Sequence, residues 1–374
     1  MKIATIIGAR PQFIKAATIS RAIHDYNTKV SISESSIKKY SQITEIIIHT
    51  GQHYDANMSD IFFREMAIPI PDYNLRIQEC RHGAMTGNML AGIEEILLKE
   101  KSDWVLVYGD TNSTLSGALA AAKLHIPVAH VEAGLRSYNR SMPEEINRIM
   151  ADQLSTFLFC PNENAVQNLY KEGFPHQLSK NNKQQIFNCG DVMYDASLYY
   201  AQMAKRPEFV EKLPVDEGYI LATIHRAENT DDPLRLKKVM QDLSKLSIPV
   251  ILPLHPRTKV KLEQSAIRLG SNIFSVEPVG FLQMVWLERH AQVIVTDSGG
   301  VQKEAYFYGV PCVTVRDETE WVELIDAGWN WLAPPLSSDL AQVVTEVIGS
   351  KGNDSQLYGN GDAAKNILEN LTIQ

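Results

Sequence analysis

The chain has 374 residues, of which 44% are hydrophobic and 21% charged, so it is long enough for two domains with substantial cores. This balance excludes a globally disordered chain. The formal net charge of −8 argues against nucleic-acid binding through bulk electrostatics, but it leaves room for a local basic pocket around a phosphorylated ligand.

The first predicted element is a short strand over residues 3–7, which breaks at Gly8-Ala9-Arg10-Pro11. This apolar run is too brief for a signal peptide, and no stretch approaches the roughly 18 apolar residues of a membrane span. We therefore expect a cytoplasmic protein without a membrane partner. The four cysteines are widely spaced and form no CxxC pair, so neither a metal site nor a disulfide framework is expected.

Strand-like runs then alternate with helix-like segments such as 85–100 and 114–123. The further strands are predicted at residues 43–49, 104–108, 128–130, 157–160, 219–223, 250–254, 273–276, 293–296 and 312–315. Most are apolar on both faces, as parallel strands covered by helices are. The pattern predicts an α/β fold with two Rossmann-like, doubly wound domains facing each other across a cleft.

The domain change is placed in the polar, irregular stretch near residues 185–215. We expect an N-terminal Rossmann-like domain over 1–190 and a C-terminal, nucleotide-binding one over 191–355. The remaining residues, 356–374, are expected to form a helix that packs back on the first domain.

The turn after the first strand occupies the place of a dinucleotide fingerprint but lacks the G-x-G-x-x-G spacing, so bound NAD is not expected. Arg10 and Lys15 on this turn and the helix after it can neutralise a phosphate or carboxylate. A plain surface position is the alternative, and it is weaker for Arg10. After the second strand, Gln52 can hydrogen-bond a sugar or amide, or merely belong to a solvated turn.

Carboxylates and arginines follow the next two strands. Asp110 ends the strand at 104–108, and Glu132 and Arg136 lie just past 128–130. Glu144 lies in the first turn of the next helix, with Arg148 on the same face at i+4. Asp110 could be a helix N-cap, but three carboxylates at one edge can raise each other's pKa and divide acid and base roles.

The second half places His225 after its first strand and His255 one strand later; a proton role is favoured for His225. Ser298-Gly299-Gly300 between strand and helix is typical of phosphate binding, although a simple glycine turn is the alternative. Glu304 suits a ribose diol, and Arg316 can reach a phosphate or the nucleotide. No Walker lysine motif is present, which disfavours magnesium-dependent nucleotide hydrolysis.

Together these motifs resemble the non-hydrolysing UDP-N-acetylglucosamine 2-epimerase family over nearly the whole chain. The resemblance rests on the turn at residues 10–15 and on the motifs Gly109-Asp110-Thr111, 130–136 (HVEAGLR), 143–148 (PEEINR), His225-Arg226 and 297–300 (DSGG). It implies a GT-B-like fold closing on a UDP-sugar substrate, a homodimer, and no metal, NAD or other cofactor.

The resemblance also implies the chemistry. UDP is eliminated to leave a 2-acetamidoglucal and then adds back with the opposite configuration at C2. The catalytic groups would be Asp110, Glu132, Glu144 and His225, with the acid and base steps left unassigned. The predicted UDP and substrate ligands are Arg10, Lys15, Gln52, Arg136, Arg148, His255, Phe281, Ser298, Gly299, Gly300, Glu304 and Arg316.

Two segments, residues 50–55 (TGQHYD) and 225–229 (HRAEN), differ from the usual UDP-GlcNAc enzymes. Residues 50–55, 8–15 (GARPQFIK) and 320–324 (EWVEL) look more like the branch that epimerises UDP-2,3-diacetamido-2,3-dideoxyglucuronic acid for surface polysaccharides. The difference puts activation by a second substrate molecule in doubt. UDP-GlcNAc is the alternative substrate, and a GT-B glycosyltransferase or a hydrolysing relative is the alternative class.

Overall fold

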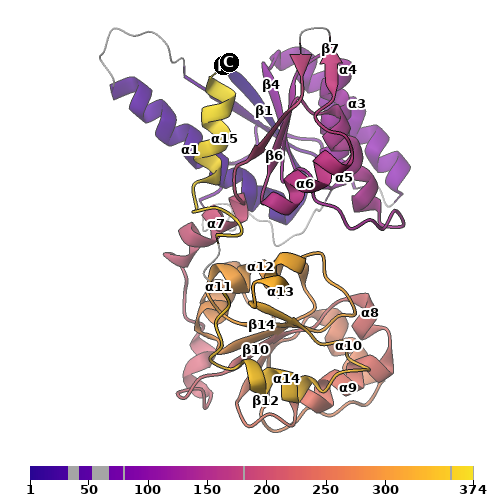
Figure 1. Ribbon diagram of the computed structural model, residues 1–374, viewed down its shortest axis with the longest axis vertical. Coiled ribbons are helices and arrows are strands. Elements are labelled where there is room, and N and C mark those ends of the chain that lie inside the picture. Colours follow the sequence, from indigo (N-terminus) through magenta and orange to yellow (C-terminus); the bar gives the residue numbers. More distant parts are fainter. Residues whose placement is uncertain (33–41, 53–66, 79–80, 180–181, 354–355, 374) are drawn as a thin grey trace. The chain divides into compact units, whose positions relative to one another are not determined.

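A computed structural model describes residues 1–32, 42–52, 67–78, 81–179, 182–353 and 356–373. The chain forms two compact units, Met1–Ala196 with Gln356–Gln374 (unit 1) and Ser197–Ser355 (unit 2). Each unit is built on a parallel sheet with helices beside it (Figure 1). The predicted class, α/β with two Rossmann-like domains, is confirmed.

The main sheet of unit 1 has the order β3-β2-β1-β4-β5-β6-β9, and all its strand pairs are parallel. Its strands are β1 (Lys2–Ile7), β2 (Thr44–His49), β3 (Tyr73–Asn74), β4 (Trp104–Tyr108), β5 (Val128–Val131), β6 (Phe157–Cys160) and β9 (Gln185–Asn188). A separate antiparallel pair joins β7 (Gln177–Ser179) to β8 (Asn182–Lys183). The strand order reverses around β1, where open parallel sheets bind ligands.

Seven helices described in the structure belong wholly or mainly to unit 1. They are α1 (Arg10–Ile32), α3 (His82–Glu100), α4 (Asn112–Lys123), α5 (Pro143–Leu154), α6 (Glu163–Lys171), α7 (Val192–Ala201) and α15 (Ala363–Thr372). The C-terminal helix α15 runs alongside α1 (Figure 1). Asp195 on α7 accepts hydrogen bonds from the backbone N–H groups of Ala363 (3.1 Å) and Ala364 (2.9 Å) and so caps α15.

Small residues let α4 approach the centre of this sheet. A Cβ on Gly117 would lie 3.0 Å from Ile6 and 3.1 Å from Val107, so a larger residue there would push the helix off β1 and β4. Thr111 begins the helix with a capping box that it shares with Thr114. The cap fixes the residue at which α4 begins after β4, and Asp110 lies in the connection between them.

The sheet of unit 2 has the order β12-β11-β10-β13-β14-β15, again fully parallel. Its strands are β10 (Ile220–Thr223), β11 (Val250–Pro253), β12 (Ile273–Val276), β13 (Val293–Thr296), β14 (Cys312–Thr314) and β15 (Asn330–Leu332). Its helices are η1 (Glu208–Lys212), α8 (Ala227–Thr230), α9 (Pro233–Leu243), α10 (Pro256–Gln264), α11 (Phe281–His290), α12 (Gly299–Phe307), α13 (Val322–Asp326) and α14 (Leu340–Val347). Two apolar clusters cover the two faces of this sheet, and the order reverses around β10.

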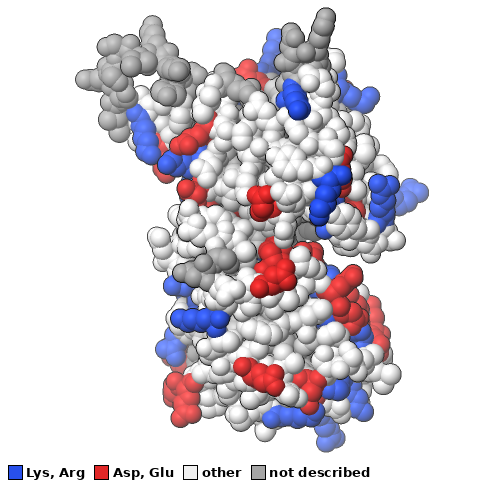
Figure 2. All heavy atoms as spheres, viewed as in Figure 1, with Lys and Arg blue, Asp and Glu red and all other residues white. Residues whose placement is uncertain are grey.

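All ten predicted strands are present, with ends within one residue of the prediction. The strands that the sequence did not reveal are β3, β9, β15 and the β7–β8 pair, which have two to four residues each and lack a long apolar run. Within the described ranges no helix is long and apolar enough to cross a membrane. Basic and acidic side chains are interspersed on the face seen in Figure 2.

Candidate active site

Charged side chains gather at the carboxyl ends of the central strands of unit 1. Because β1, β4 and β5 are neighbours, the segments that follow them emerge at the same edge of the sheet. Asp110 follows β4 and Glu132 follows β5, while Lys15 comes from α1 and Arg148 from α5. The structure therefore brings together four of the predicted site residues.

These four side chains form two ion pairs, Lys15 with Glu132 and Arg148 with Asp110. Gly109 lies against the first pair, since a Cβ there would stand 3.1 Å from Glu132 Oε2 and 3.7 Å from Lys15 Nζ. Its φ of +62° also favours glycine. A side chain at this position would strain the backbone and press on the ion pair.

The turn after β5 has an unusual backbone. Glu132 adopts φ +70°, a left-handed conformation that costs energy for any residue other than glycine and is often found at functional sites. Two residues later Gly134 has φ +79°, and a Cβ on it would stand 2.4 Å from the carbonyl oxygen of Ala165. The surrounding structure thus holds Glu132 in place at a local conformational cost.

Burial raises the pKa of Asp110 above its usual range. The charge of Arg148 opposes this rise, nearby Glu132 adds to it, and Lys15 opposes it. Asn147 fixes the backbone here, because its Nδ2 donates to the carbonyl oxygen of Asp110 at 2.9 Å. A carboxyl group with a raised pKa next to a cation suits proton transfer near neutral pH.

Glu144 and Arg148 lie on α5 as predicted, but the residue of this helix that Arg148 contacts is Glu145. Arg148 contacts Glu145 Oε2, three residues before it, at 3.2 Å, whereas Glu144 is exposed in the first turn of α5. Glu145 is buried and accepts hydrogen bonds from the backbone N–H groups of Ser137 (2.9 Å) and Tyr138 (3.0 Å). Sequence reasoning missed this role, and the adjacent Glu-Glu pair was the only signal of it.

Gln12 is a second residue that sequence reasoning missed. It is 2% exposed, and its Oε1 accepts from the N–H groups of Gly8 (2.8 Å) and Ala9 (3.0 Å). Its Nε2 donates to the carbonyl oxygen of Tyr108 at 2.7 Å and to Thr111 Oγ1 at 3.0 Å. Gln12 thus ties the turn after β1 to the turn after β4.

The remaining predicted residues of unit 1 fall into different settings. Arg10 is exposed at the start of α1. Gln52 Oε1 accepts hydrogen bonds from the N–H (3.1 Å) and Oγ (2.8 Å) of Ser113 at the start of α4. Residues 53–55 of the 50–55 motif lie outside the described residues.

Arg136 is placed differently from the prediction. Its side chain is fully buried, with Nη1 2.7 Å from Asp152 Oδ2 and Nε 2.7 Å from Glu172 Oε1. Nη1 also donates to the carbonyl oxygen of Leu135, and Nη2 donates to Glu172 Oε2. Because these partners occupy its guanidinium, Arg136 is a residue that holds the turn after β5 and not one that offers a cation to substrate.

Unit 2 centres its site on the buried carboxylate of Asp297, which follows β13. The backbone N–H groups of His225 (3.1 Å) and Arg226 (3.0 Å) and the side chain of Asn229 (3.1 Å) all donate to it. His225 Nδ1 also lies 3.4 Å from Asp297 Oδ1, which orients the ring. Burial lowers the pKa of His225, opposed by the charge of Asp297, so the imidazole is neutral at neutral pH.

The turn predicted to bind phosphate lies at the start of α12. Ser298 is the N-cap of this helix, but its side chain makes no capping hydrogen bond, and Gly300 is exposed. A Cβ on Gly299 would lie 2.5 Å from Glu320 Oε1, so the turn also depends on glycine for space. An open helix start with small residues is a suitable place for a phosphate.

Glu304, one turn into α12, is hydrogen-bonded to Glu288 of α11. Burial raises the pKa of Glu288 well above its usual range, and the charge of Glu304 adds to this rise. A carboxyl group with a raised pKa can donate to a neighbouring carboxylate, which is compatible with Glu304 as an acceptor, the role predicted for it beside a ribose diol.

The last three predicted residues lie around the same edge of unit 2. Arg316 is held by Glu228 (3.2 Å) and Glu320 (2.7 Å). His255 is the N-cap of α10, and its ring centroid is 6.0 Å from that of His225. Phe281 begins α11.

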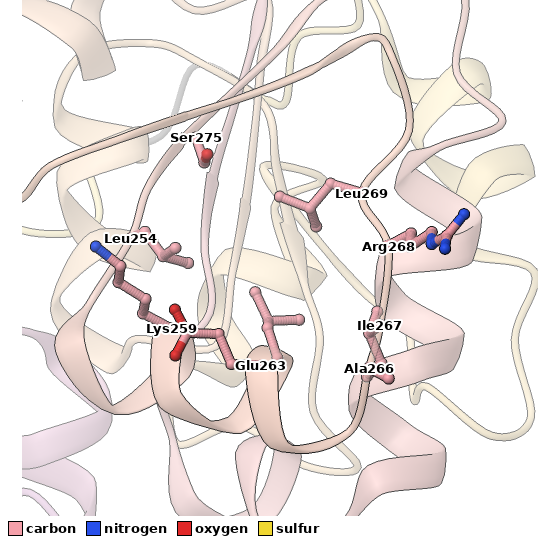
Figure 3. Close-up of a pocket in the computed structure, with 9 residues that line it drawn as sticks. Leu254, Lys259, Glu263, Ala266, Ile267, Arg268, Leu269 and Ser275 are labelled. Carbon is pink, nitrogen blue, oxygen red and sulfur yellow. The ribbon is translucent and has the colours of Figure 1, made fainter.

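A separate surface pocket of unit 2 lies elsewhere (Figure 3). It has a volume of about 420 Å³ and is lined by Leu254, Lys259, Leu262, Glu263, Ala266, Ile267, Arg268, Leu269 and Ser275. None of the predicted site residues lines it. Among the described residues, no group of three or more His, Cys, Asp or Glu side chains is placed to hold a metal ion.

Comparison with known proteins agrees with this chemistry. The family model for UDP-N-acetylglucosamine 2-epimerase matches residues 35–372. The chain is 52% identical to the UDP-2,3-diacetamido-2,3-dideoxy-D-glucuronate 2-epimerase of Pseudomonas aeruginosa, with 99% of each chain covered. It is 42% identical to the UDP-N-acetylglucosamine 2-epimerase of Methanocaldococcus jannaschii, covering 100% of this chain and 99% of that one. The crystal structure of the latter enzyme with UDP-GlcNAc and UDP matches over 100% of both chains, with a TM-score of 0.82.

Proposed function

This chain belongs to the UDP-N-acetylglucosamine 2-epimerase family, and on that premise we propose that it inverts C2 of UDP-2,3-diacetamido-2,3-dideoxy-D-glucuronate. The observation that carries the choice of substrate is the 52% identity to an enzyme of that name, against 42% to a UDP-GlcNAc enzyme. UDP-GlcNAc is the second candidate, because the family model and the matched crystal structure both carry that name.

We propose that the reaction proceeds by elimination. A base removes the C2 proton while the C1–O bond breaks, and UDP departs with the bonding electron pair to leave a glucal with a C1=C2 double bond. A proton then adds to the opposite face of C2, and a β-phosphate oxygen of UDP attacks C1. Each half-reaction needs a proton-transfer group and a cation near the leaving phosphate.

The two ion pairs of unit 1 support this proposal. Asp110 and Glu132 are carboxylates that transfer protons, and Arg148 and Lys15 provide positive charge beside them. The Nε of Arg148 is buried and finds no hydrogen-bond partner within the described part of the chain, which suits a group that awaits a ligand. Glu144 stays a proposed third carboxylate and His225 a proposed further acid or base.

In unit 2 we propose that the diphosphate binds at Ser298 and Gly299 and that Glu304 receives the ribose diol. Gly300 and Arg316 would complete this cradle. The start of α12, where Ser298 makes no side-chain capping hydrogen bond, and the raised pKa of Glu288 beside Glu304 support the assignment.

We further propose that the enzyme is cytoplasmic and a homodimer. Ile146 and Met150, four residues apart on α5, are 49% and 42% exposed and offer an apolar surface for a second copy. Sedimentation equilibrium checks this: a dimer is expected, and conversion to a monomer by Met150→Glu would place α5 in the interface.

Comparing kcat/KM for the two UDP-sugars tests the substrate. The uronic acid should be preferred by at least about 100-fold, since a site that pairs polar groups with a ligand discriminates strongly against one that lacks them. A preference for UDP-GlcNAc would assign the chain to the general epimerases. Hydrolysis to free sugar and UDP, or turnover only with an added acceptor, would reject the epimerase proposal.

A further inference from the structure

His130 lies on β5, between the two site turns of unit 1, and the proposed reaction gives it no role. Its side chain is fully buried. Nδ1 lies 2.7 Å from Asp152 Oδ1, and Nε2 lies 2.7 Å from the carbonyl oxygen of Gly109. Both ring nitrogens therefore make short hydrogen bonds, and both face oxygen atoms.

The two partners decide the charge of the ring. A neutral imidazole has one N–H donor and one acceptor nitrogen, but a carbonyl oxygen only accepts. If Asp152 is ionised it also only accepts, and both ring nitrogens must then carry protons. The alternative is a protonated Asp152 that donates to a neutral His130.

Asp152 has the surroundings of an ionised group. Its Oδ2 lies 2.7 Å from Arg136 Nη1 and accepts from the N–H of Gly134 at 3.2 Å. Although burial alone would raise the pKa of Asp152, the hydrogen bond from His130 and the charge of Arg136 bring it below its usual range.

The charges of the cluster balance when His130 is an imidazolium. His130 and Arg136 then supply two cations, and Asp152 and Glu172 supply two anions. The neighbouring thiol of Cys160 on β6 stays neutral, because burial raises its pKa well above the usual range. A neutral His130 would instead set the lone pair of a ring nitrogen against one of these oxygen atoms, or leave an uncharged Asp152 beside Arg136.

We propose that His130 is a buried imidazolium that positions the Gly109 carbonyl and, through that peptide, the carboxylate of Asp110. The peptide unit before Gly109 is already fixed, since the N–H of Gly109 donates to the carbonyl oxygen of Val131 at 2.9 Å. Glycine at φ +62° has no side chain to fix this peptide by itself. A charge-assisted bond from His130 supplies the restraint.

The same dyad also fixes the other carboxylate. Asp152 holds the N–H of Gly134, two residues after Glu132, while His130 holds the peptide before Asp110. His130 is thus a positioning residue for both proposed catalytic carboxylates. Its part in turnover rests on the proposed function, but its charge does not.

Nitrogen-15 NMR of the full chain, labelled in histidine, tests the charge without substrate. In the resting full chain, the ring of one histidine should show two N–H signals, one at each nitrogen. Both should vanish in His130→Asn and persist in His125→Asn, the matched control at an exposed histidine with φ +59°. If His130→Asn does not fold, Asp152→Asn identifies the two ring N–H signals of His130 instead, because this change should shift their resonances. A single ring N–H for His130 would overturn the proposal.

Turnover tests the positioning role separately. His130→Asn should lower kcat about 100-fold with little change in KM, because a misplaced carboxylate slows proton transfer without removing a UDP ligand. Unchanged kcat would overturn the positioning role. If the wild-type protein shows both N–H signals but epimerises no UDP-sugar, the proposed function fails while the charge of His130 stands.

Discussion

Replacing Arg148 with Met should move the pH dependence of catalysis, because Arg148 is the cation paired with Asp110. Two unit charges about 4 Å apart interact by about 4 kcal/mol at an effective dielectric constant near 20, which corresponds to about three pKa units. The Asp110 side chain is 33% exposed, so solvent screening should reduce this by roughly half. Removing Arg148 should therefore raise the pKa of Asp110 by about 1–2 units.

The assay is the profile of kcat/KM against pH. If Asp110 must be ionised, activity is lost as pH falls through its pKa, so the acid limb should move to higher pH by about 1–2 units in Arg148→Met. Arg148→Lys keeps the charge and serves as the matched control, with a smaller shift. An acid limb that stays in place in Arg148→Met would show that the pair does not set the charge of a catalytic Asp110.

Three further predictions concern single groups. Asp110→Asn, Glu132→Gln and Glu144→Gln should each cut turnover at least about 100-fold with folding intact, as steady-state kinetics and circular dichroism can show. Ser298→Ala should weaken UDP binding, measured by calorimetry, because it removes a hydroxyl from the proposed phosphate site. Burial raises the pKa of Asp195 from 3.8 to about 6, so its favourable contribution is complete below pH 3.8 and is lost as pH rises through about 6. Asp195→Asn should remove that loss. Protection of the α15 amides should fall as pH rises through about 6 in the wild type, beyond the intrinsic increase of exchange with pH, but not in the variant, which keeps only one of the two capping acceptors.

Each of these predictions has a result that counts against it. Glu95→Gln, which changes an exposed carboxylate on α3, is the control for the three carboxylate variants. Near-normal turnover in any one of those three variants would exclude its residue from the mechanism. Unchanged UDP affinity in Ser298→Ala would move the phosphate site elsewhere. The same pH dependence of protection in wild type and Asp195→Asn would show that the cap carries no ionisation cost.

The motifs at strand ends could be predicted from the sequence, because in a parallel sheet the residues that follow the strands lie at one edge. An apolar run followed by a glycine and a carboxylate, as at Gly109 and Asp110, gives the strand end and the ligand edge together. The same argument located His225 and the Ser298–Gly300 turn. The short edge strands β3 and β15 could not be predicted from the sequence, since two or three residues are too few to show a hydrophobic periodicity.

The sequence could not show which polar side chains use up their hydrogen bonds inside the protein. Arg136 was indistinguishable from Arg148 until the fold brought Asp152 and Glu172 to it from distant segments. The choice between Glu144 and Glu145 as the partner of Arg148 depends on helix phase, which one residue of error reverses. Long-range tertiary contacts therefore decide the setting of Arg136, whereas local helix geometry decides that of Arg148.

Proton NMR in D2O, with the purified enzyme and UDP-2,3-diacetamido-2,3-dideoxy-D-glucuronate, tests the central proposal most directly. The elimination account predicts a manno product with deuterium at C2, because the proton lost from C2 is replaced from solvent on the opposite face. A manno product that keeps the original C2 hydrogen would contradict elimination, and an unchanged spectrum would contradict the proposed substrate.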